Sequence, residues 1–454
     1  MSKRNDSLSN FCVQMNFERL PQNVIERAKL IIIDCVGAIL GGIAEKDIKD
    51  LVKLRSKTTP IADYVQIIST NQWAERSQAA LLYGAAGTVL EMDEGHQFAK
   101  GHPGIHVLPA ILSAIQSNWQ GRKVSGQEFL TAFIVGYDIA ARIGAGSKLR
   151  HTMHPHGTWG VIGASVAIGK LSGLNFIQTK ELLNISSSLT TATSRKTMLE
   201  GGTVRNVYAG MSNQMAFLAL DLIHSNFTGE NDGIKSIFGS VISDGLDDEI
   251  ILDHLGENFE VMRNYFKIHA CCRYNHAALD ALCIMMDRHY ELETLGNIKS
   301  INVESYDLAA ELDDPNPKNM LAAKFSIPFA VATTLVNKTT TVESFLGHAL
   351  SNPEVLELAK KVTVIENPSM TKSLPEYRPA KVKITLKTGK VFCHEVLTNR
   401  GDWRDPYSSE ELKEKFFSLA ELSLDNQQAA SLFKSLASLE DCDDIKEIFE
   451  INYG

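Results

Sequence analysis

The chain has 454 residues, 44% of them hydrophobic and 22% charged, a composition typical of a soluble globular protein long enough for two domains. Its formal net charge is −9 and it has no Lys- or Arg-rich run with interleaved aromatic residues, so we expect no nucleic-acid partner. The seven cysteines are odd in number and no pair has CxxC spacing, which argues against a disulfide framework or a cysteine-rich zinc site.

The sequence predicts a cytoplasmic protein without a membrane-spanning segment. The first residues, MSKRNDSLSNF, are not followed by an apolar h-region, so we expect no secretory signal. The longest apolar stretch, residues 28–43, contains Lys29 and Asp34 and is too short and too interrupted to cross a bilayer. Scattered cysteines fit the reducing environment of the cytoplasm.

Regularly spaced apolar residues predict that nearly all of the chain up to about residue 260 is helical. Residues 20–42 open with Leu20-Pro21, and apolar side chains then recur every three to four residues until Gly41-Gly42 stops the helix. Ser125 can cap a strong helix over residues 125–142, with Glu128 completing a capping box. Further helices are predicted over residues 47–57, 77–90, 158–172, 179–188 and 212–224, and a short strand over residues 64–69.

The character of the sequence changes near residue 298. Strands are predicted over residues 300–306 and 362–366, a hairpin over 380–386 and 391–397, and a helix around 324–337. Helical periodicity returns after residue 400, at residues 409–419, 425–438 and 444–451. We therefore predict a mainly α protein with a large all-helical domain (residues 1–268 and 400–454) and a smaller α+β domain (residues 269–399).

Candidate site residues gather in four short stretches, three of which contain eight of the thirteen histidines. Within residues 90–114, we expect Gly95, Gly101, Pro103 and Gly104 to break regular secondary structure. The other three stretches are residues 150–160 and 201–210, each before a predicted helix, and residues 267–276, at the predicted domain boundary. The candidate side chains in the four stretches are Glu91, Asp93, Glu94, His96, His102, His106, His151, His154, His156, Arg205, Lys267, His269, Arg273 and His276.

Two interpretations of these histidines do not involve acid–base catalysis. The spacing of His102 and His106, with His154 and His156 as further ligands, could serve a metal. However, Pro103-Gly104 argues against a regular helix from His102, and no HExxH signature is present, so we expect no metal. Structural roles are the other interpretation: His106 as a hydrogen-bonded core residue, His151 and His289 on the surface, and Cys271-Cys272 as small apolar side chains.

The third interpretation is acid–base chemistry without a metal. Histidine titrates near neutral pH, so a pair of histidines can remove one proton and deliver another. Arg205, Lys267 and Arg273 could neutralise substrate carboxylates, and the helix N-termini after residues 157 and 210 would favour anions. A serine or cysteine nucleophile is less favoured because no GxSxG motif is present.

Five stretches of the chain, in order, resemble segments of the MmgE/PrpD superfamily, which includes 2-methylcitrate dehydratase, cis-aconitate decarboxylase and iminodisuccinate epimerase. They are LEMDEGH followed by GHPG, MHPHGTWGVIGA, TVRNVYAG, KIHACCRYNHAALDA and AAKFSIPFAVA. The resemblance implies a helical domain with a smaller α+β lid, a homodimer, a site between the domains, and catalysis without cofactor or metal. By this resemblance, Asp93 falls on a family acid, and His102, His154 and His276 fall on family histidines.

Several positions depart from the family pattern. Arg205 stands where the family has Lys, Gly95 where it has Thr, and Phe329 where the decarboxylase pattern has Tyr. Arginine keeps the charge of lysine but is a poor proton donor. His96 and His156 are additional histidines.

Together these observations predict a cofactor-free lyase that acts on a small di- or tricarboxylate, of the cis-aconitate decarboxylase or 2-methylcitrate dehydratase type. The expected catalytic residues are Asp93, His102, His154 and His276; the expected substrate-binding residues are Glu91, His96, His156, Arg205, Lys267 and Arg273. An epimerase or isomerase of a small dicarboxylate such as iminodisuccinate is one alternative, and a non-catalytic carboxylate-binding member is the other.

Overall fold

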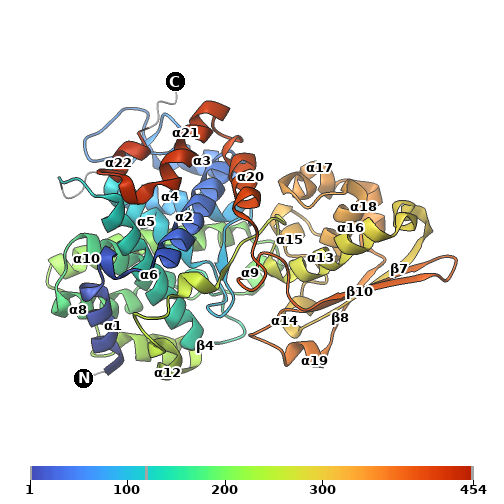
Figure 1. Ribbon diagram of the computed structural model, residues 1–454, viewed down its shortest axis with the longest axis horizontal. Helices are drawn as coiled ribbons and strands as arrows, with labels where there is room; N and C mark the ends of the chain where they lie inside the picture. Colours follow the sequence, from blue (N-terminus) through green and yellow to red (C-terminus); the bar gives the residue numbers. More distant parts are fainter. Residues whose placement is uncertain (1–2, 118–120, 451–454) are drawn as a thin grey trace.

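The computed structural model describes residues 3–117 and 121–450 as a large helical unit joined to a smaller unit that contains a sheet (Figure 1). The helical unit begins with α1 (Lys3–Gln14), α2 (Gln22–Ile43), α3 (Lys46–Arg55), α4 (Arg76–Val89), α5 (Pro103–Gln116) and α6 (Gly126–Gly146). It continues with α7 (Gly160–Leu171), α8 (Phe176–Ser188), α9 (Lys196–Leu199), α10 (Tyr208–His224), α11 (Gly233–Ser236) and α12 (Asp248–Leu252).

Small residues let the helices of this unit approach closely. A Cβ on Gly84 of α4 would lie 2.6 Å from the backbone of Gly210 in α10, so neither position has room for a side chain. This crossing brings the short 3-10 helix Thr203–Val207, which precedes α10, beside the C-terminal end of α4. Both segments contribute residues to the site described below.

Helix α6 is the central helix of the unit. Its capping box is the predicted one, because the Ser125 side chain accepts from the Glu128 N–H and the Glu128 carboxylate accepts from the Ser125 N–H. By length and composition α6 alone, among the described residues, could cross a membrane, but 94% of its apolar window is buried inside the protein. It is the core helix of the helical unit.

A four-stranded sheet organises the second unit, with strand order β10-β9-β7-β8. The strands are β7 (Ile298–Ser305), β8 (Val362–Glu366), β9 (Ala380–Leu386) and β10 (Val391–Val396), and only the β7–β8 pair is parallel. Helices α13 (Arg273–Arg288) and α16 (Ile327–Asn337) pack on the sheet, where Val382, Ile384 and Leu386 of β9 are buried. We call residues 273–396 the sheet unit.

The sheet unit also carries α14 (Asp307–Ala310), α15 (Met320–Lys324), α17 (Gly347–Leu350), α18 (Pro353–Ala359) and α19 (Pro368–Thr371). The chain then returns to the helical unit, where α20 (Ser409–Ala420) and α21 (Asn426–Ala437) pack on α2, followed by α22 (Ile445–Ile448) (Figure 1). This layout supports the mainly α class with a small α+β part. The predicted boundary at residues 269–399 stays a prediction.

Two local predictions were wrong. Pro103 and Gly104 do not interrupt regular structure but form the first turn of α5, with His102 as its N-cap. Proline is favoured there because the first helical N–H has no partner within the helix. The predicted strand over residues 64–69 is only the two-residue strand β1 (Val65–Gln66), paired with β2 (Trp73–Ala74).

The remaining strands are short pairs that fix loops. They are β3 (Gly95–His96) with β6 (Asn264–Tyr265), and β4 (Ser147–Leu149) with β5 (Ser243–Leu246). The β3–β6 pair ties the loop after α4 to the segment that leads into the sheet unit.

Candidate active site

A pocket lies where the helical unit meets the sheet unit. The helical unit lines it with Glu91, His96, Gln97, Lys100, His102, His154, Pro155, His156, Arg195, Met198 and Arg205. The connecting segment and the sheet unit add Tyr265, Cys272, Arg273, Tyr274, Phe325 and Arg378. Basic side chains dominate this lining, and Glu91 is its only carboxylate among the described residues.

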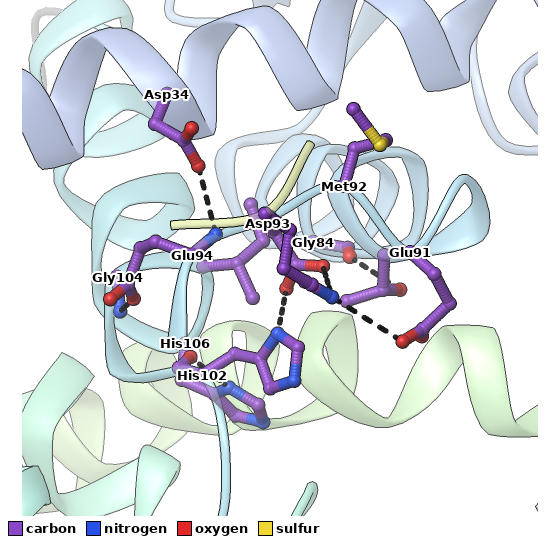
Figure 2. Close-up of polar contacts among 12 residues, drawn as sticks. Asp34, Gly84, Glu91, Met92, Asp93, Glu94, His102, Gly104 and His106 are labelled. Carbon is purple, nitrogen blue, oxygen red and sulfur yellow. Dashed lines mark hydrogen bonds and ion pairs between the residues drawn. The ribbon is translucent and has the colours of Figure 1, made fainter. Parts of the chain in front are cut away.

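An Asp–His pair forms the centre of the site. His102 Nδ1 lies 2.7 Å from Asp93 Oδ2, and Figure 2 shows the two side chains pointing toward one another. Burial alone would raise the pKa of Asp93, but the His102 ring and the Lys267 ammonium outweigh it and lower that pKa well below its usual range. Asp93 is therefore a carboxylate that accepts from Nδ1–H, which leaves Nε2 of His102 for the pocket.

The first turn of α5 fixes the backbone of His102. Its carbonyl accepts a hydrogen bond of 2.7 Å from Nδ1–H of His106, one turn along α5 (Figure 2). His106 is fully buried and burial lowers its pKa to about 4, so it is a neutral core histidine, as one of the sequence interpretations expected. The first turn of α5 thereby holds the backbone of His102 while Asp93 holds its side chain.

A second ion cluster lies beside this pair. Arg205 forms an ion pair with Glu91, and Lys267 Nζ lies 3.4 Å from Glu91 Oε2 and 3.6 Å from Asp93 Oδ1. Burial would raise the pKa of Glu91, but the charges of Arg205 and Lys267 lower it. The structure therefore pairs two of the three predicted substrate-binding cations, Arg205 and Lys267, with protein carboxylates.

The second histidine stretch packs against the first. His156 lies at the centre of a cluster of imidazoles, with its ring centroid 4.7 Å from those of His102, His106 and His154. Burial, followed by the charge of Arg205, lowers the pKa values of His154 and His156 well below the usual histidine value. Both rings are therefore neutral at physiological pH.

The protonation pattern of His154 follows from its partner. The backbone N–H of His156 donates to His154 Nδ1 over 3.0 Å, so the single proton of the neutral ring is on Nε2. His154 therefore offers the pocket a hydrogen-bond donor and no free basic nitrogen.

Two other predicted histidines use their ring nitrogens within the protein. His96 Nδ1 accepts from the Ala99 N–H, and Nε2 lies 2.9 Å from a Glu260 oxygen, so neither nitrogen is available to a ligand. His276, predicted to be catalytic, is fully buried and is not among the residues that line the pocket. Its Nε2–H donates to the Cys271 carbonyl over 3.2 Å.

Four basic pocket residues differ in how their charges are balanced. Arg195 pairs with Glu311 at 2.9 Å, and Arg273 pairs with Asp402 at 2.5 Å. No carboxylate of the described residues lies within ion-pair distance of Lys100 or Arg378, although both line the pocket. Of these four, the sequence predicted only Arg273. Arg195 and Arg378 lie outside the four candidate stretches, and Lys100 lies inside the first one but was not selected there.

A buried carboxyl lies directly behind the Asp–His pair. Glu94 accepts hydrogen bonds from the Gly104 N–H (2.8 Å) and the Tyr137 hydroxyl (2.9 Å), and its own N–H donates to Asp34 (Figure 2). Burial raises the pKa of Glu94 to about 8. Through Gly104, this side chain fixes the first turn of the helix that presents His102.

The chemistry of the site follows from these contacts. One histidine, His102, has both a carboxylate partner and a ring nitrogen that faces the pocket, while the other lining histidines are neutral or occupied. Among residues 3–117 and 121–450, no group of three or more His, Cys, Asp or Glu side chains has an arrangement that could hold a metal ion. The pocket can thus bind an anion and deliver a proton to it.

Comparisons with known proteins relate the whole chain to one family. The model of the MmgE/PrpD N-terminal domain matches residues 6–242, and that of the MmgE/PrpD C-terminal domain matches residues 269–441. The helical unit and the sheet unit, which together line the pocket, therefore both contain matched segments.

Curated relatives share about a quarter of their residues with this chain over nearly its full length. Cis-aconitate decarboxylase of Aspergillus terreus is 24% identical over 455 residues, covering 95% of this chain and 92% of the relative. Cis-aconitate decarboxylase of Homo sapiens is 26% identical over 446 residues, covering 94% and 89%. That of Mus musculus is 25% identical over 476 residues, covering 99% and 93%.

Proposed function

The chain belongs to the MmgE/PrpD family, and from this membership and the pocket geometry we propose that it is a lyase that decarboxylates a small di- or tricarboxylate of the cis-aconitate kind. The observation that carries the proposal is the 2.7 Å contact between Asp93 and His102 Nδ1 at the edge of a strongly basic pocket. It supplies one imidazole that can hold a proton next to a bound anion.

The proposed reaction needs one proton. The bond between the substrate carbon and its leaving carboxylate breaks, and carbon dioxide departs. The electron pair stays on the substrate, delocalised into an adjacent double bond. His102 Nε2–H then protonates the carbanion equivalent, while Asp93 stabilises the imidazolium beforehand. A proton from water restores His102.

Other pocket groups have supporting roles in this proposal. The Nε2–H of His154 donates a hydrogen bond to a substrate oxygen, because its Nδ1 already accepts from the protein. Arg205 and Lys267 hold Glu91 and Asp93 ionised and add positive potential at the reacting end. The sheet unit acts as a lid that excludes water, within a cytoplasmic homodimer.

The histidine protonation pattern favours decarboxylation over the alternatives. Dehydration needs a base for one proton and an acid for the leaving hydroxyl, and epimerisation needs proton exchange on two faces of one carbon. Among the histidines that line the pocket, only His102 has both the carboxylate partner and the open nitrogen that either role requires. His154 is neutral with its basic nitrogen occupied, and Arg205 is a poor proton donor.

Proton NMR in D₂O tests the proposal and separates the alternatives. EDTA-treated protein is incubated separately with cis-aconitate, 2-methylcitrate and iminodisuccinate. We expect the cis-aconitate signals to give way to a decarboxylated alkene that carries one solvent deuterium. An alkene from 2-methylcitrate would identify a dehydratase, and α-deuteration of iminodisuccinate without elimination an epimerase. No change in any sample would contradict the proposal and favour a non-catalytic member.

A further inference from the structure

The pocket holds more positive charge than its own carboxylates balance. Arg205 and Lys267 share Glu91 and Asp93, Arg195 has Glu311, and Arg273 has Asp402. Lys100 and Arg378 line the same pocket with no carboxylate partner among the described residues. Two unbalanced cations match an anion of more than one negative charge.

Arg378 is the more unusual of the two because it is buried. Its relative exposure is 4%, and its Nε and Nη1 atoms make no hydrogen bond of good geometry with the described residues. Burial alone would lower the pKa of Arg378, but the neighbouring Tyr306 hydroxyl interacts with the guanidinium and contributes to its raised pKa. A buried guanidinium normally has its donors satisfied, since an unmet charged donor is costly. The ring centroids of Tyr274 and Tyr306 lie 5.1 Å and 5.9 Å from its Cζ and support its plane.

The position of Arg378 is set from the helical unit. Its Nη2–H donates to the Gln97 carbonyl over 3.0 Å. The Gln97 side chain donates to the carbonyls of Pro375 (3.2 Å) and Glu376 (3.1 Å). Gln97 belongs to the tight turn after β3, closed by the His96–Gly101 bridge, and Lys100 lies in the same turn. One loop therefore presents Lys100 and fastens the segment that presents Arg378.

Lys100, Arg273 and Arg378 line the same pocket, Lys100 as an exposed residue and the two arginines as buried ones, and their charges interact. Desolvation of its ammonium group lowers the pKa of Lys100, the Tyr274 phenol opposes this, and the positive charge of Arg378 lowers it further. Burial, then Arg378, also lowers the pKa of Arg273, whose Nη1 is buried without an acceptor. An anion placed among Lys100, Arg273 and Arg378 would relieve this repulsion and accept their open donors.

We propose that Arg378, with Lys100 and the open Nη1 of Arg273, forms a second carboxylate subsite that binds a non-reacting carboxylate of the substrate and sets a preference for polycarboxylates. The proposal rests on the proposed function for the identity of the reacting end. The subsite joins the two units, because Arg378 comes from the sheet unit and Lys100 from the helical unit. Substrate charge and closure of the site are thereby coupled.

Ligand-observed NMR titration with two probes tests the subsite without requiring turnover. Glutarate and butyrate differ by one carboxylate, so the ratio of their dissociation constants measures its contribution. We expect the protein to bind glutarate about 10- to 100-fold more tightly, as for a charged hydrogen bond. Arg378→Gln should reduce this ratio to below about threefold. Arg378→Lys should give an intermediate ratio, because lysine keeps the charge but lacks the paired N–H donors of the guanidinium.

Lys372→Gln is the matched control, since Lys372 is an exposed cation six residues before Arg378. It should leave the ratio unchanged, and thermal melting should show that all variants are folded. An unchanged ratio in Arg378→Gln, or no glutarate preference in the unmodified protein, would overturn the subsite. Glutarate preference without turnover of any acid would instead leave the subsite standing and reject the proposed function.

Discussion

At the scale of the residue, the histidines of this pocket differ in chemical role because their ring nitrogens have different hydrogen-bond partners. His96 and His102 both contact a carboxylate, Glu260 and Asp93. The second ring nitrogen of His96 accepts from a backbone N–H, while that of His102 faces the pocket. A carboxylate partner therefore marks a proton donor only where the other nitrogen is open.

Asp93→Asn tests the electrostatic role of the Asp–His pair. Asparagine keeps the size of the side chain but removes the charge that stabilises the imidazolium. We expect kcat for decarboxylation to fall by about 100- to 10,000-fold, the range of general acid catalysis. Steady-state kinetics with cis-aconitate measures this, and Asp50→Asn on the exposed face of α3 is the control. Equal loss in both variants would reject a specific role for Asp93.

The raised pKa of Glu94 predicts that the free energy of unfolding depends on pH. The pKa of Glu94 is raised to about 8 from an ordinary 4.5, so the folded protein holds a proton that the unfolded chain releases. Its contribution is complete below about pH 4.5 and is lost as the pH rises through about 8, at up to about 1.4 kcal/mol per pH unit.

Glu94→Gln should flatten this dependence because glutamine stays neutral. Urea unfolding between pH 5.5 and 8.5 measures it, with the exposed Glu354→Gln as the control. Parallel pH profiles for the unmodified protein and Glu94→Gln would show that Glu94 titrates normally.

The sequence indicated Asp93, His102 and Lys267 because each lies in a stretch dense in titratable groups, and Arg205 because it lies between glycines before a predicted helix. It could not show that Arg205, Lys267 and Arg273 already have carboxylate partners. Arg378 has no local signal, since its place in the pocket depends on a contact with Gln97, 281 residues away in the chain. Lys100 lies in the first candidate stretch, but only the folded chain shows that it lines the same pocket as Arg378. Charge balance in a pocket is a property of the folded chain.

At the scale of the element, local chemistry decided which predictions succeeded. The β9–β10 hairpin follows its predicted range because Gly389 supplies the left-handed turn residue (φ +88°) between alternating strands. The start of α5 was misinterpreted because proline was treated as a breaker when it occupies the one helical position that tolerates it.

We predict that the turn after β3 affects substrate binding through the hydrogen bonds of Gln97 to the sheet unit. Gln97→Ala removes two hydrogen bonds to the carbonyls of Pro375 and Glu376 and leaves the Gln97 carbonyl in place. We expect KM for cis-aconitate to rise about 5- to 20-fold with kcat within about twofold, because Arg378 is held less firmly. The exposed Gln427→Ala is the control. A fall in kcat at constant KM would instead place Gln97 in the chemical step.

At the scale of the whole molecule, the pocket exists only where the two units meet. The sequence predicted the change from helical to strand periodicity near residue 298 and the return to helices after residue 400. Which faces of the two units meet was not, because it depends on long-range contacts such as Arg195 with Glu311. The family resemblance, and not periodicity, supplied the expectation of a site between domains.

If the sheet unit is the lid that we propose, ligand binding should change hydrogen exchange locally. With saturating glutarate, amide hydrogen exchange should slow in residues 270–276 and 375–379, which carry the sheet-unit side of the pocket. Exchange at the turn of the β9–β10 hairpin, residues 387–390, at the end of the sheet unit away from the helical unit (Figure 1), should be unchanged and serves as the internal control. Uniform protection of the whole unit would indicate general stabilisation instead of closure.

The most direct test of the account is the turnover of cis-aconitate in D₂O by the unmodified protein and by His102→Gln, followed by proton NMR. We predict one solvent deuterium in each decarboxylated product molecule, and a rate at least about 100-fold lower in His102→Gln than in the exposed-surface variant His224→Gln. A His102→Gln protein that retains the full rate of decarboxylation would contradict the assignment of His102 as the proton donor.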